Sequence, residues 1–181
     1  MKQLRLAFPI ALAFASPLWL SDPAHAQSAS KPEAVAPYAA TLTIVVDLGS
    51  GDGRIVIAAA TKFKARRGLG VDIEPSLVKF SNDSAAQAGV ADRVKFREED
   101  LFKTDVSEAT VVTVYLLPRA MPPLEQKLLA ELKPGTRVVV QDYPFPTWRA
   151  ERVVELKTPE KETSAGLPYA QLYLYKVPAR K

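Results

Sequence analysis

The chain has 181 residues, enough for one α/β domain and too few for two domains of ordinary size. With 48% hydrophobic and 24% charged residues it is typical of a globular protein, and its net charge of +4 comes without a lysine- and arginine-rich block, so we expect no nucleic-acid partner. The chain has no cysteine and one histidine, His25, near its start, which excludes thiol nucleophiles, histidine bases and Cys- or His-ligated metals from the folded part.

The first 26 residues have the three parts of a secretory signal peptide. Lys2 and Arg5 give a positive start, residues 6–20 are almost entirely apolar, and Ala24-His25-Ala26 is a small-residue cleavage site. The apolar run is shorter than the roughly 20 residues that a membrane span needs. We therefore expect cleavage after Ala26 and export to the periplasm or the exterior, with a membrane anchor as the lesser alternative. The expected division is 1–26 signal peptide, 27–40 linker and 41–181 folded domain.

Seven runs of β-branched and other apolar residues are expected to be strands. They are 41–48, 68–73, 93–97, 110–117, 137–141, 152–157 and 169–177. The first run is β-branched and ends at glycines, as a buried parallel strand does. The last two runs follow one another without a helical pattern between them, so we expect them to pair as an antiparallel hairpin at one edge of the sheet.

Three helices are expected, at 54–64, at 75–88 and from Pro122 to Lys133. The first is apolar on nearly every face, which predicts a place in the interior. Proline suits the first turn of the second helix, and the third has leucines four residues apart on one stripe. The pattern predicts an α/β fold: a Rossmann-like, doubly wound, mostly parallel seven-stranded sheet with an antiparallel C-terminal hairpin.

The turn after the first strand has glycine at three alternate positions, which lets the backbone turn tightly and lie against a ligand. They are Gly49, Gly51 and Gly53. A dinucleotide fingerprint would need a further glycine where the chain has Arg54. Asp52 would also repel a pyrophosphate at the helix N-terminus, so a nicotinamide oxidoreductase is disfavoured. S-adenosylmethionine carries no phosphate, and Asp47 and Asp52 suit its cationic end.

Other carboxylates follow the next two strands. Asp72 ends the second strand, about 20 residues beyond the turn, where a carboxylate can accept hydrogen bonds from both ribose hydroxyls; Glu74 is a weaker candidate. After the third strand, Asp100 and Leu101 stand where the adenine amino group would lie. Any one of these acids could equally be a solvated loop carboxylate, so the hypothesis depends on their occurring together with the glycine turn.

Three segments resemble motifs I, post-I and II of class I S-adenosylmethionine-dependent methyltransferases: VVDLGSGDGRIVIAAA, GVDIEPSLV and EEDLF. Further along, VVTVYLLP and LEQKLLAELKPGTRVVVQDYPFPTW resemble the mitochondrial lysine methyltransferases of ATP synthase c subunit and adenine nucleotide translocase, and their bacterial relatives. The likeness runs from about Ile44 to Trp148. It implies S-adenosylmethionine as cofactor and N-methylation of a protein lysine.

The resemblance also implies site residues. The glycines would hold the methionine part, Asp72 the ribose and Asp100 the adenine. The full set expected to bind the cofactor is Asp47, Gly49, Ser50, Gly51, Asp52, Gly53, Asp72, Ile73, Asp100, Leu101 and Leu116. The candidate acceptor channel consists of Tyr115, Leu117, Pro118, Tyr143, Phe145 and Trp148. Tyr115 and Phe145 could equally be core aromatics, and no catalytic residue is assigned.

Two other functions stay open. Members of this family usually carry two helices before the first strand, whereas Tyr38 is followed almost at once by the strand, which leaves an inactive, methyltransferase-fold binding protein as an alternative. The residues themselves also allow a small-molecule acceptor. We expect a monomer with no metal site and no membrane span after signal cleavage.

Overall fold

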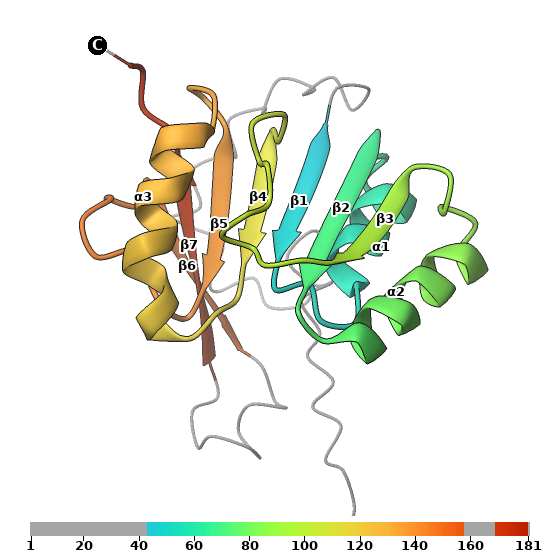
Figure 1. Cartoon of the computed structure of the whole chain (residues 1–181). Helices are drawn as coiled ribbons and strands as arrows, with labels where there is room; N and C mark the ends of the chain where they lie inside the picture. Colours follow the sequence, from blue (N-terminus) through green and yellow to red (C-terminus); the bar gives the residue numbers. More distant parts are fainter. Residues whose placement is uncertain (1–42, 158–168, 181) are drawn as a thin grey trace, which may run out of the picture.

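The computed structural model describes residues 43–157 and 169–180, which contain a seven-stranded sheet flanked by helices (Figure 1). The strands lie in the order β3-β2-β1-β4-β5-β7-β6. The first five are mutually parallel, and β7 runs antiparallel to both β5 and β6. Their bounds are β1 Ile44–Leu48, β2 Arg67–Asp72, β3 Val94–Glu98, β4 Val111–Val114, β5 Arg137–Gln141, β6 Arg152–Lys157 and β7 Tyr169–Lys176. The predicted fold class is confirmed.

The helices cover both faces of the sheet. Helices α1 (Arg54–Lys62) and α2 (Pro75–Gln87) pack beside each other on β1, β2 and β3. Helix α3 (Met121–Glu131), preceded by the 3-10 turn η3 (Pro118–Ala120), lies on the other face (Figure 1). The predicted leucine stripe of α3 is fully buried against valines of β1, β4 and β5, and forms the larger core.

The first helix is less enclosed than its sequence predicted. In α1 only Val56 and Ala60 are buried, while Thr61 and Lys62 are exposed. The reason is that α1 forms a single layer: its neighbours among the described elements are β1, β2, β3 and α2. The prediction of an interior helix was wrong, although its position after the glycine turn was right.

Strand β4 is shorter than predicted, because it ends at Val114 rather than at Leu117. Leu117 has φ −68° and ψ 151°, the extended conformation that a following proline imposes, and Pro118 opens η3. Residues 115–117 therefore leave the sheet at the edge where the parallel strands end. The expected signal peptide and most of the linker lie outside the described residues, and within the described ones no helix is long and apolar enough to cross a membrane.

Candidate active site

The glycine turn connects β1 to α1 in a conformation that needs glycine. Gly49, Gly51 and Gly53 have φ of 81°, 54° and 77°, a region that other residues rarely adopt. A Cβ at Gly49 would lie 2.8 Å from Leu116 Cδ2, and one at Gly53 would lie 2.6 Å from Phe96 Cζ. At Gly51 a Cβ would meet nothing within 4 Å, so the turn offers open space there.

Asp72, at the end of β2, lies against this turn. Its Oδ2 accepts a hydrogen bond from the backbone N–H of Gly51 at 2.9 Å, and its Oδ1 accepts one from Glu74 N at 3.0 Å. The N–H groups of Gly49 and Ser50 both donate to Val71 O at 2.9 Å, which ties the turn to β2. The turn and the carboxylate therefore form one rigid unit.

Glu74, the weaker ribose candidate, has a structural role. Its Oε1 accepts hydrogen bonds from the N–H and the hydroxyl of Ser76, at 3.3 and 2.8 Å, and so caps the N-terminus of α2. This leaves Asp72 as the carboxylate that approaches the turn from β2.

Asp47 is a buried carboxyl group beneath the turn. Its side chain accepts a hydrogen bond of 2.6 Å from the hydroxyl of Thr113 on the neighbouring strand β4. The pKa of Asp47 is raised to about 7, chiefly by burial. The hydrogen bond from Thr113 lowers this pKa, whereas the charges of Asp72 and Asp52 raise it. A cation near Asp47 would favour its ionised form, since opposite charges stabilise each other.

Asp52 is already paired with Arg54. The Arg54 Nε donates to both carboxylate oxygens at 2.8 Å, and the Arg54 guanidinium also contacts Oδ2. Burial works against ionisation, but the hydrogen bonds from Arg54 outweigh it and lower the pKa of Asp52. The electrostatic argument that gave Asp52 to a cationic cofactor is weakened accordingly, because Arg54 compensates its charge.

The loop after β3 carries the expected adenine residues. Glu99 N donates to Asp72 O at 3.1 Å, which places this loop beside the end of β2. Asp100 Oδ1 accepts from Phe102 N at 2.9 Å, so this carboxylate also shapes its own loop. Leu101 packs partly against the core, whereas Ile73 is 75% exposed. The residues share one edge of the sheet.

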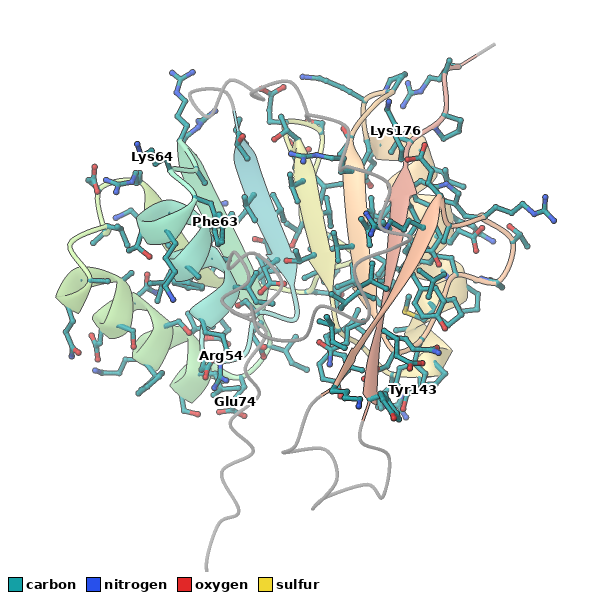
Figure 2. All side chains as sticks on the ribbon, turned by 180° about the vertical axis from the view of Figure 1, so that it is seen from behind. Arg54, Phe63, Lys64, Glu74, Tyr143 and Lys176 are labelled. Carbon is teal, nitrogen blue, oxygen red and sulfur yellow. The ribbon has the colours of Figure 1, made fainter. Side chains whose placement is uncertain are left out.

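The acceptor candidates divide into two groups. Tyr115, Leu117 and Tyr143 are all partly exposed. Partial burial raises the pKa of Tyr115, and the nearby Asp142 and Tyr143 raise it further, so Tyr115 lies near these two residues. Figure 2 shows Tyr143, Arg54 and Glu74 toward one end of the strands, the lower end in this view, with Lys64 and Lys176 toward the other end.

Phe145 and Trp148 belong to a different cluster. Phe145 is buried in the core, and its ring lies 5.5 Å from that of Trp148 and 5.0 Å from that of Tyr175. A cavity of about 380 Å³ beside these rings is lined by residues within 144–153 and by Tyr173 and Tyr175, with none from the glycine turn. Phe145 is therefore a core aromatic residue, whereas Tyr115 is partly exposed just after the end of β4.

Sequence reasoning missed Gln141 and Asp142, the last residue of β5 and the one that follows. Asp142 has φ 63°, and its Oδ1 accepts from Gln171 N on β7 at 3.0 Å. Its Oδ2 accepts from Gln141 Nε2 at 3.3 Å. Their place at a strand end is the same signal that singled out Asp72. Over the described ranges, no cluster of His, Cys, Asp or Glu could hold a metal ion.

Comparison with known proteins gives a consistent result. The family described as "ANTKMT methyltransferase domain" matches residues 47–152. The protein-lysine N-methyltransferase of Saccharolobus islandicus is 40% identical over 63% of this chain and 71% of its own length. The lysine N-methyltransferase of the ATP synthase c subunit in Mus musculus is 40% identical over 71% of this chain, and the chain spans about half, 48%, of that relative.

Among solved structures, an RNA methyltransferase from Salinibacter ruber in complex with S-adenosyl-L-homocysteine superposes with a TM-score of 0.69. It is 43% identical, and the match covers 78% of this chain and 84% of that one.

Proposed function

This chain belongs to the ANTKMT methyltransferase domain family and is an S-adenosylmethionine-dependent methyltransferase, and from that premise we propose that it methylates the ε-amino group of a lysine on a protein. The observation that carries the proposal is the unit formed by the glycine turn and Asp72, joined by the 2.9 Å hydrogen bond to Gly51. The family match over residues 47–152 contains this unit, and relatives named for lysine methylation are 40% identical to the chain.

The residues of the turn fit the cofactor. Ser50 Oγ is buried and has no hydrogen-bond partner within the described part of the chain, and the surface at Gly51 is open. When bound, S-adenosylmethionine supplies a methyl group whose bond to sulfur breaks, the electron pair staying on sulfur, as the acceptor nitrogen bonds to the carbon. Asp47 and the Ser50 hydroxyl would hold the amino-acid end, with Asp72 on the ribose, and the open backbone at Gly51 would let the cofactor lie against the turn.

The chain's own residues must also prepare the acceptor. A lysine is a nucleophile only when neutral, and deprotonating it at pH 7 costs about 4.6 kcal/mol from its free pKa near 10.4. Because burial raises the pKa of Tyr115, with Asp142 adding to the effect, Tyr115 stays a neutral phenol and is no base at this pH. We therefore expect the proton to leave to water, helped by the positive charge of the cofactor's sulfonium, which disfavours the ammonium.

Incubation with labelled methyl donor and a membrane-protein extract, followed by mass mapping, tests the acceptor. We expect label on lysine side chains of one or a few proteins, and much less label with Asp72→Ala at the same concentration of methyl donor. Label confined to small molecules would contradict the proposal. So would a chain that binds S-adenosylhomocysteine in calorimetry and transfers nothing, which would support the inactive binding protein instead.

RNA is a second candidate acceptor, favoured by the 43% identity to the Salinibacter ruber protein. The chain has no block of basic residues, which argues against it. Adding total RNA to the same incubation and separating the nucleic acid from the protein before counting distinguishes the two, since only one fraction would carry the label.

We further propose that the protein is exported and acts as a monomer. The signal-like layout of residues 1–26 supports export. Mass analysis of the secreted or periplasmic fraction should find a mature chain that begins at Gln27, and light scattering should give the mass of one chain. An intact Met1 in the cytosolic fraction would contradict export.

A further inference from the structure

The side-chain carbonyl of Gln141 is a buried acceptor without a donor. Gln141 is 5% exposed, and its Oε1 has no hydrogen-bond partner among the residues that the structure describes. Buried polar groups in folded proteins are nearly always paired, so a retained exception calls for an explanation. A ligand that brings an N–H donor to this oxygen would supply one.

The orientation of this amide is set by its neighbour. Gln141 Nε2 donates to Asp142 Oδ2 at 3.3 Å. Turning the amide over would place its oxygen against a carboxylate oxygen, two acceptors facing each other, which is unfavourable. The carbonyl must therefore point away from Asp142, and the pair presents two separate oxygen acceptors.

The position of the pair relative to the cofactor turn follows from the sheet. Strand β4 lies between β1 and β5, so the end of β5 is two strand spacings, roughly 10 Å, from the end of β1. Val114 and Val140 are in register and both face the core under α3, so the next residues, Tyr115 and Gln141, emerge where these strands end. The backbone oxygen of Tyr115 would lie 3.8 Å from a Cβ at Gly49, so the residue that follows β4 lies beside the glycine turn.

We infer that Gln141 Oε1 and the Asp142 carboxylate, with Tyr115 beside them, form the subsite that receives the acceptor amine; the inference rests on the proposed function and adds the residues that recognise the amine. A primary amine or ammonium has two or three N–H donors and can bridge both oxygens, whereas a hydroxyl has one. The amide oxygen accepts an N–H without taking its proton, so it orients the nitrogen. The carboxylate attracts the cationic form as it arrives, and the ammonium must then lose a proton to water before the nitrogen accepts the methyl group. Together they select an amine over an alcohol.

Binding of n-butylammonium, which mimics a lysine side chain, tests the subsite without turnover. The full chain is loaded with S-adenosylhomocysteine and titrated with n-butylammonium or n-butanol while the Gln141 side-chain signals are followed by NMR. We expect n-butylammonium alone to shift them. Gln141→Met should weaken n-butylammonium binding, measured for wild type and variant by calorimetric titration, about tenfold to a hundredfold, as expected for loss of a hydrogen bond to a charged group. It should leave S-adenosylhomocysteine affinity unchanged.

Gln126→Met, an exposed position on α3, is the matched control and should behave as wild type. Asp142→Asn provides a second variant, because asparagine tolerates the left-handed backbone and can still accept from Gln171 N. It should also weaken n-butylammonium binding. Equal shifts with n-butanol, no shift at all, or unchanged binding in both variants would overturn the subsite.

The two proposals fail in different ways. If wild type binds n-butylammonium through Gln141 but methylates no protein lysine, the subsite stands and the proposed function falls. If wild type methylates poly-L-lysine and Gln141→Met does so with the same KM, the function stands and the subsite falls.

Discussion

Asp47 shows how one buried carboxyl group can make folding stability depend on pH. Its pKa is raised to about 7, chiefly by burial, so the folded chain holds a proton that the unfolded chain releases near pH 3.8. The unfolded state therefore binds fewer protons between these values, and stability falls as pH rises through that window. Above about pH 7 both states are ionised at this group and the effect levels off.

The free energy of unfolding of the ligand-free chain should accordingly decrease between pH 5 and pH 8, by as much as about 3 kcal/mol from Asp47. Asp47→Asn should remove this part of the pH dependence and be more stable than wild type at pH 8. Urea denaturation of both proteins at the two pH values measures it. A wild-type curve that matches the variant's at both values would show that the Asp47 pKa is not raised.

Two carboxylates of the site should respond differently to truncation. Asp72→Ala removes the acceptor for Gly51 N–H and the proposed ribose ligand, so S-adenosylhomocysteine affinity should fall by about 1.5–3 kcal/mol. Asp52→Ala should change affinity by less than about 1 kcal/mol, because Arg54 already compensates that charge. Calorimetric titration of the two variants decides, and a larger loss from Asp52→Ala would reverse the assignment.

At the scale of elements, the glycine turn is shaped by two separate constraints. Gly51 needs glycine for its backbone angle alone, whereas Gly53 needs it for both its angle and the ring of Phe96. We expect Gly51→Ala to cost about 1–2 kcal/mol of stability and Gly53→Ala clearly more. Denaturation of both variants, with the exposed Gly89→Ala as a control for the angle alone, measures the difference. Equal losses at Gly51 and Gly53 would mean that Phe96 moves aside.

The segment between β5 and β6 is held by contacts rather than by regular structure. Glu125, buried in α3, accepts hydrogen bonds from both the N–H and the hydroxyl of Thr147. Phe145 N donates to the Tyr175 hydroxyl at 3.0 Å. These contacts fix the course of the chain after Tyr143.

At the scale of the whole molecule, the aromatic cluster joins this segment to β7 and to the core under α3. Trp148 is half-buried between Phe145 and Tyr175, with ring centroids 5.5 and 5.1 Å away. Trp148→Ala should therefore lower stability by about 3 kcal/mol while S-adenosylhomocysteine affinity stays the same. Denaturation and calorimetry of this variant test the two parts. If stability is unchanged and methyl transfer to protein is lost, the channel role would hold instead.

Local signals in the sequence were sufficient for the elements and for the turn. Alternating β-branched runs, proline at helix starts and glycine at alternate positions act over a few residues, so five strands and all three helix starts were predicted within one residue, and the glycine turn and Asp72 were identified as a pair. Leu117 shows the limit of such signals, since the apolar run continues to Leu117 although the strand ends at Val114.

What only the tertiary structure decided is which side chains meet across the sheet. Asp47 and Thr113 are 66 positions apart, and they touch because β4 lies beside β1. The burial of Phe145, the pairing of Asp142 with β7 and the unpaired carbonyl of Gln141 likewise depend on strand order. Strand order follows from packing the whole chain, and burial and long-range hydrogen bonds are consequences of that packing, so no local pattern contains them.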